Sequence, residues 1–149
     1  MNLTRGLKEL WDMIVSPKHM SVAYFGIYIV TVAGGMVSVF VPPVTLQNEL
    51  GPVLTFVWGS MILGGGMIGL MSVLPGWWWL ERLGIILAVT GIGIYFAIVT
   101  YLQINTYLAP DPSGSKLTQM AFTILATSVF GIRWLVIRSY SFAPRKVDC

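Results

Sequence analysis

The chain has 149 residues, of which 56% are hydrophobic and only 10% are charged, with a formal net charge of +3. A soluble globular domain carries about 25% charged residues, so this chain has too few to cover a water-facing surface. One cysteine and one histidine exclude an internal disulfide and a multi-thiol or His-rich metal centre. We therefore expect an integral membrane protein with no metal, no cofactor and no nucleic-acid partner.

Residues 1–19 are predicted to form an amphipathic helix, because apolar side chains recur at helical spacing and charged ones take the other face. Such a segment lies in the cytoplasmic interface, where its bases attract anionic headgroups. It is either an orienting anchor or a partner-binding helix. A cleaved signal peptide is the competing interpretation, because TVAGG (31–35) follows an apolar run, but a long segment carrying Glu9 and Asp12 precedes it.

Four segments reach the length of about 20 apolar residues that a bilayer requires. Lipid offers no partners to backbone polar groups, so each should be an α-helix. The prolines support these boundaries, since all eight fall outside the spans, and Pro52 suits a first helical position. The predicted fold is an all-α, four-helix transmembrane domain over residues 20–137, arranged as two hairpins, with a basic tail over 138–149. The spans are about 20–41, 53–74, 83–102 and 117–137.

The bases predict the orientation. Eight of the nine lie before the first span, between the second and third, or at the end of the fourth, and only Lys116 lies on the opposite side. The positive-inside rule then places both termini in the cytoplasm.

Every span carries small residues that let helix backbones approach closely. They pack the four helices of one chain together, or one ridge faces another protomer in a homo-oligomer. Gly65 and Gly69 are the best candidates for the second role. The candidate packing residues are Gly34 and Gly35 in the first span, Ser60, Gly64, Gly65 and Gly69 in the second, Gly93 and Ala97 in the third, and Thr127 and Gly131 in the fourth.

Three consecutive tryptophans, Trp77, Trp78 and Trp79, precede the third span. They could form a ligand platform, but neighbouring helical residues turn by about 100°, so the three cannot share one face. We expect them to anchor the chain at the cytoplasmic interface, with Glu81 and Arg82 marking where it meets water. The other expected interface anchors are Trp134, Tyr140 and Arg138.

Chemistry-bearing residues are scarce. Spans one to three, as bounded above, contain no Asp, Glu, Lys, Arg or His, and Arg133 in the fourth is expected to snorkel to the interface. No phosphate-binding loop and no carboxylate pair is found. We therefore expect that the protein is not an enzyme.

Two stretches, SPKHMSVAYFGIYIVTVAGGM (16–36) and LPGWWWLERLG (74–84), together with the basic tail APRKVDC (143–149), carry a resemblance. The whole layout resembles the small four-span, holin-like membrane proteins encoded beside lysis genes of actinobacterial bacteriophages. The resemblance implies accumulation in the inner membrane, lateral self-assembly and permeabilisation during phage lysis. A non-pore interaction protein, acting as an accessory subunit of a membrane complex or as a phage exclusion factor, is the alternative; other membrane or phage proteins would then be its partners.

Overall fold

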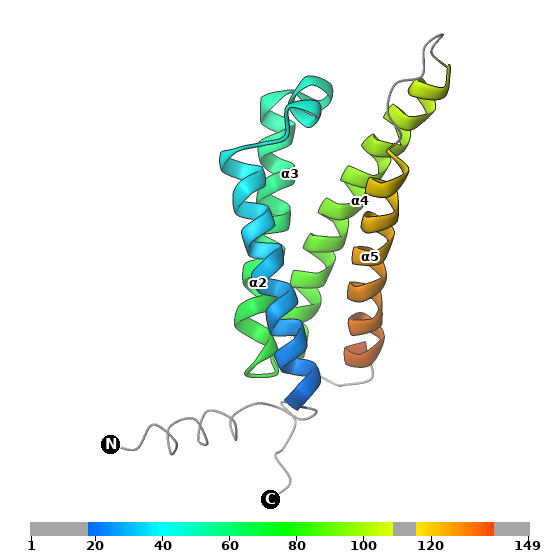
Figure 1. Ribbon diagram of the computed structural model, residues 1–149. Coiled ribbons are helices and arrows are strands. Elements are labelled where there is room, and N and C mark those ends of the chain that lie inside the picture. The colour runs from blue at the N-terminus through cyan, green and yellow to red at the C-terminus, as the bar shows by residue number, and fades with distance from the viewer. Residues whose placement is uncertain (1–17, 109–115, 139–149) are drawn as a thin grey trace, which may run out of the picture.

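The computed structural model describes residues 18–108 and 116–138, and these residues contain helices and short connections but no strand. Each helix is long and apolar enough to cross a membrane, as expected of a multi-pass membrane protein. The predicted amphipathic helix, Tyr140 and nearly all of the basic tail lie outside the described residues. The helices are α2 (Lys18–Phe40), α3 (Val44–Val73), α4 (Trp78–Leu108) and α5 (Leu117–Arg138) (Figure 1).

Helices α2 and α5 match the predicted spans 20–41 and 117–137 closely, whereas α4 is longer at both ends than the predicted 83–102. The stretch WWWLER (77–82) therefore leads into α4, which begins at Trp78, and does not form a turn between two helices. The backbone N–H groups of Leu80 and Glu81 both donate to the Trp77 carbonyl, at 3.0 and 2.9 Å, which begins the first turn. Because α4 begins at Trp78 and not at residue 83, Glu81 lies within this helix.

Helix α3 is broken near its start. Gly51 has φ 75° and ψ 168°, a left-handed backbone that suits glycine, and Pro52 directly follows it. The Thr55 hydroxyl stabilises this break. Its proton is shared between the Gly51 carbonyl, at 2.8 Å, and the Leu46 carbonyl, at 3.3 Å. The long part of α3 thus begins at Pro52, as predicted, after a short helical segment.

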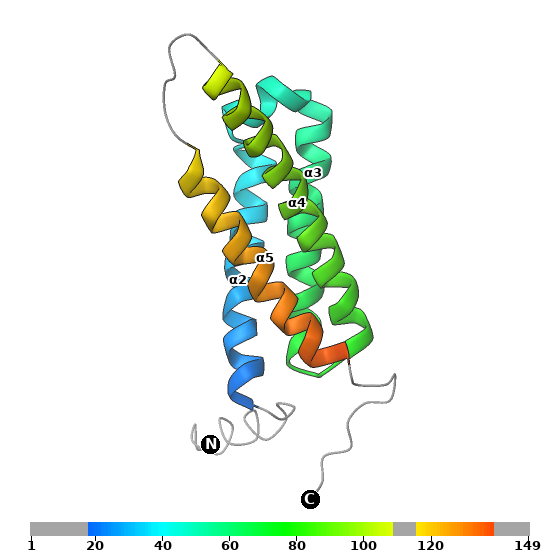
Figure 2. The same cartoon turned by 90° about the vertical axis from the view of Figure 1, so that its right-hand side faces the viewer.

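Helices that follow one another in the chain pack side by side: α3 lies against both α2 and α4, and α5 lies against α4. The start of α2, the α3–α4 connection and the end of α5 lie together at what we call the α3–α4 end, at the bottom of Figure 1. The α2–α3 connection, the end of α4 and the start of α5 lie at the opposite end. Helix α5 is inclined to α2, as Figure 2 shows.

The core gathers toward the α3–α4 end, where four helices meet. Leu46, Trp58 and Val99 are buried outside this cluster, but many other large apolar side chains are exposed, as suits helices whose outer surface faces lipid. The buried core cluster consists of Tyr24, Tyr28, Val73, Trp78, Ile85, Ala88, Phe130 and Ile137.

Candidate functional site

The tight turn between α3 and α4 sets the position of the candidate site. Gly76 has φ 74°, and the N–H groups of Gly76 and Trp77 both donate to the Ser72 carbonyl, at 3.0 and 3.1 Å. A left-handed glycine just after a helix is a common way to end it and satisfy its last carbonyls. The next helix starts at once, so Glu81 lies in the first turn of α4 and faces the bundle interior.

Glu81 and Arg133 form a buried ion pair between α4 and α5. Their side chains are 0% and 1% exposed. The Arg133 guanidinium donates from Nε to Glu81 Oε1 at 2.6 Å and from its NH2 group to Oε2 at 2.8 Å. This two-bond geometry matches the planar guanidinium to the carboxylate and fixes the register of the two helices.

Aromatic side chains of α2 and α4 complete this charged cluster. The Tyr28 hydroxyl donates to Glu81 Oε1 at 3.2 Å. The guanidinium carbon of Arg133 lies 4.9 Å from the ring centre of Tyr24 and 5.6 Å from that of Trp78, within the range of cation–π attraction. The cluster therefore ties together three helices: α2, α4 and α5.

The charged cluster is suited to holding helices rather than to catalysis. Moving two charges out of water costs several kcal/mol per ion, which is offset only when the pair is close and its remaining polar atoms are hydrogen-bonded. Here both Glu81 oxygens accept hydrogen bonds, and the carboxylate is wholly enclosed. Within residues 18–108 and 116–138, no three His, Cys, Asp or Glu side chains gather as a metal site would require.

Two expectations about charge are wrong. Glu81 does not mark where the chain meets water, because the longer α4 carries it into the core. Arg133 does not snorkel, because its partner lies beside it inside the bundle. The feature of the sequence that could have indicated this pair is Arg133, because an ionisable residue within a membrane span usually has a partner.

Arg82 and Arg138 act at the end of α5. The Arg82 guanidinium donates to the carbonyls of Ile137 and Arg138, at 2.8 and 3.2 Å, which have no acceptor role left within the helix. Arg138 itself is an exposed base in the last turn, where it complements the negative end of the helix dipole.

The three tryptophans separate into two environments. Trp78 is 4% exposed and belongs to the core, whereas Trp77 and Trp79 are 50% and 55% exposed. The three therefore do not form one stacking surface, as the helical turn predicts. Trp134, which is also expected to be an interface anchor, is partly buried and packs against the core. Interface anchoring stays a prediction for Trp77 and Trp79.

Gly65 and Gly69 do not face another protomer, because they contact neighbouring helices of the same chain. A Cβ at Gly65 would lie 2.6 Å from the Ala88 nitrogen and 2.8 Å from the Gly84 oxygen of α4. A Cβ at Gly69 would overlap the Tyr28 ring. Both glycines are thus needed for close approach of α3 to its neighbours.

The other candidate packing residues fall into two groups. Gly35 is also internal, since a Cβ there would lie 2.6 Å from the Leu63 backbone, and Ser60 is half-buried with its hydroxyl bonded to the Phe56 carbonyl. Space is open around Gly34, Gly64, Gly93 and Gly131, and Ala97 and Thr127 are exposed.

An outer face of α4 and α5 carries one glycine and two hydroxyl side chains among larger apolar ones. A depression of about 270 Å³ there is lined by Val89, Gly93 and Phe96 of α4 and by Ile124, Thr127 and Ser128 of α5. We call this the α4–α5 outer face. The hydroxyls of Thr127 and Ser128 donate to carbonyls of their own helix, at 2.9 and 2.8 Å, which makes their exposure to lipid tolerable.

Comparison of the chain with protein families, with curated proteins and with solved structures finds no match.

Proposed function

We propose that the four helices cross a bacterial inner membrane as two hairpins, with both termini in the cytoplasm. Arg82 and Arg138 lie at the α3–α4 end, and Lys116 directly precedes α5 at the opposite end. The positive-inside rule supports the α3–α4 end as the cytoplasmic one.

We propose that the protein is holin-like: it self-assembles in this membrane and permeabilises it during phage lysis. The α4–α5 outer face is the observation that carries the proposal. Polar and small residues on a lipid-facing surface favour packing against another protein, because hydroxyls and close backbone contacts gain more there than against lipid chains.

The same face suits both states that such a protein needs. In an isolated protomer, Thr127 and Ser128 satisfy their hydroxyls within α5, so the protein accumulates without disturbing the bilayer. Each hydroxyl keeps acceptor capacity for another donor. In an assembly, these groups would contact a neighbouring copy or line a water-filled lesion.

The test is inducible expression in a bacterium, with membrane potential and entry of a membrane-impermeant dye followed over time. We expect depolarisation and dye entry from the intact chain, and loss of both from Gly93→Leu, which fills the α4–α5 outer face. Gly64→Leu is the matched control, because it adds the same side chain at an open glycine of α3. Stable growth with the intact protein abundant in the membrane would refute the proposal.

A second candidate function is that of a non-pore interaction protein. The buried ion pair favours it, because its charges do not face a lumen. Glu81 and Arg133 satisfy each other inside the protomer, and the exposed surface is rich in large apolar side chains. Such a surface supports docking to another membrane protein without any lumen. Co-purification of one defined partner, with no depolarisation, would favour this candidate.

A further inference from the structure

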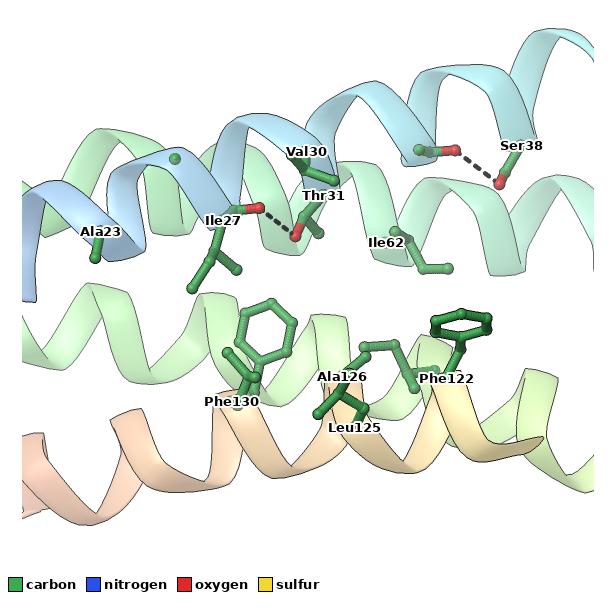
Figure 3. Close-up of a pocket in the computed structure, with 14 residues that line it drawn as sticks. Ala23, Ile27, Val30, Thr31, Ser38, Ile62, Phe122, Leu125, Ala126 and Phe130 are labelled. Atoms are coloured by element: carbon green, nitrogen blue, oxygen red, sulfur yellow. Dashed lines mark hydrogen bonds between the residues drawn. The ribbon is translucent and has the colours of Figure 1, made fainter. Parts of the chain in front are cut away.

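A long groove runs between α2 and α5 on the side of the molecule away from the α4–α5 outer face. Its volume is about 690 Å³. The floor is Ile62 of α3 and Ile92 of α4, and the walls are α2 from Ala23 to Ser38 and α5 from Phe122 to Phe130. Figure 3 shows side chains of the two walls facing each other across this space, which is almost wholly apolar.

The volume decides which kind of occupant fits. Over the α5 wall, about 13 Å long, an incoming helix about 10 Å across would need roughly 1,000 Å³. A methylene group is about as large as a water molecule, whose share of liquid volume is about 30 Å³, so a chain of about sixteen carbons needs roughly 500 Å³. A groove of this size therefore favours a hydrocarbon chain over a helix as its occupant.

The groove continues into a second, mostly apolar cavity toward the opposite end of the bundle, which adds a few polar side chains to the lining. A second cavity of about 430 Å³ shares Ile62, Ile92, Phe122 and Ala126 with the groove. Its remaining lining includes the stacked pair Trp58 and Tyr95, with ring centres 5.9 Å apart, and the polar residue Gln119. The Tyr95 hydroxyl and the Gln119 amide supply hydrogen-bonding groups beside the end of an apolar chain.

A positive charge lies one helical turn from the polar lining of this second cavity. Lys116 directly precedes α5, three residues before Gln119, and its backbone N–H donates to Gln103 Oε1 of α4 at 2.6 Å, which fixes the backbone there. Residues 116, 119 and 123 follow one another on one helical face, and Gln119 and Thr123 line the second cavity. Neither Lys116 nor Glu49, the two charged residues described at this end, lines the cavities themselves. Lys116 is one helical turn from Gln119, whereas Glu49 belongs to the short first segment of α3.

We propose that the groove binds one phospholipid from the leaflet at the α2–α3 connection. One acyl chain lies between α2 and α5, and the phosphate lies against Lys116 and Gln119. Lys116 gives the site a preference for anionic headgroups.

The test uses the full chain, purified in a mild detergent and supplied with phosphatidylglycerol or phosphatidylcholine of the same chains. Native mass spectrometry then counts lipids retained per protomer. We expect one retained lipid, with phosphatidylglycerol preferred, and a preference lowered about fivefold in Lys116→Gln. Glu49→Gln is the matched control, because it changes charge at the same end without touching the groove.

Ala126→Trp, which fills the junction of the two cavities, should retain no lipid. Gly34→Leu fills the groove from the opposite wall, where no heavy atom lies within 4 Å of an added Cβ. This variant replaces Ala126→Trp in the test if Ala126→Trp does not fold. Equal retention by the intact chain and both filled variants would overturn the proposal, as would cross-linking of α2 of one copy to α5 of another through the groove. Lipid counts do not depend on membrane leakage, so this test and that of the proposed function fail independently.

Discussion

The buried ion pair allows a sharp test by replacing Arg133 and Glu81 singly and together. Arg133→Met keeps much of the side-chain volume but removes both hydrogen bonds to Glu81, at 2.6 and 2.8 Å, and leaves a carboxylate at 0% exposure with only Tyr28 as a described donor. Removing one partner of a buried pair destabilises by about 3–5 kcal/mol. Glu81→Leu should do the same, because it leaves the guanidinium without its carboxylate.

The double variant Glu81→Leu with Arg133→Met should recover most of this loss. No uncompensated charge remains, and apolar replacements of a buried pair are often neutral or stabilising. The two changes should therefore be strongly non-additive, with a coupling of at least about 2 kcal/mol, at the upper part of the range for contacting residues.

The measurement is the free energy of unfolding in mixed micelles, titrated with a denaturing detergent. Arg138→Met is the matched control, since it removes an exposed arginine from the same helix, where little change is expected. Single variants that each lose less than about 1 kcal/mol, or a double variant as unstable as their sum, would refute the view that the pair fixes α5.

Three further predictions concern contacts between helices, measured in the same unfolding assay unless stated. Gly65→Ala should destabilise the protein by about 1–3 kcal/mol, because the added Cβ would lie 2.6 Å from the backbone of α4. Gly64→Ala is the control and should not destabilise it, because the space there is open; equal effects of the two changes would contradict the close packing. Trp58→Phe should lose about 1–3 kcal/mol, because its indole N–H donates to a carbonyl of α4 at 2.8 Å; no loss would mean that water or lipid replaces the bond. Arg82→Met should speed hydrogen exchange in the last turn of α5, and unchanged exchange there would argue against its role as a cap.

The helices could be predicted from sequence because they depend on local properties. Long apolar runs bounded by prolines place α2 and α5 closely, and Pro52 marks the start of the long part of α3. The start of α4 could not be placed this way. Trp77 to Arg82 has the composition of an interface, and only the turn made by Gly76 and Ser72 shows that the helix begins there.

The candidate site was less predictable, because it depends on contacts between distant parts of the chain. Glu81 and Arg133 are 52 residues apart, and each alone has an ordinary explanation at a membrane surface. The same limit applies to the glycines: spacing marks Gly64 and Gly65 equally, but one faces open space and the other faces α4. Sequence periodicity identifies a ridge, whereas the neighbour that the ridge meets follows from tertiary packing.

The unequal distribution of polar contacts along α5 bears on how the proposed assembly would form. At the α3–α4 end α5 is held by the Glu81–Arg133 pair, by the Tyr24 hydroxyl on the Val129 carbonyl at 3.1 Å, and by Arg82. Toward the opposite end, α2 and α5 are separated by the groove. Breaking the held end would bare charges to lipid at a cost of several kcal/mol. At the other end, the described polar contact between α4 and the start of α5 is the bond from the Lys116 N–H to Gln103 Oε1, at 2.6 Å. We therefore expect a rearrangement that packs Thr127 and Ser128 against a neighbouring copy to pivot about the charged cluster, because this movement breaks one neutral hydrogen bond and keeps the charges covered.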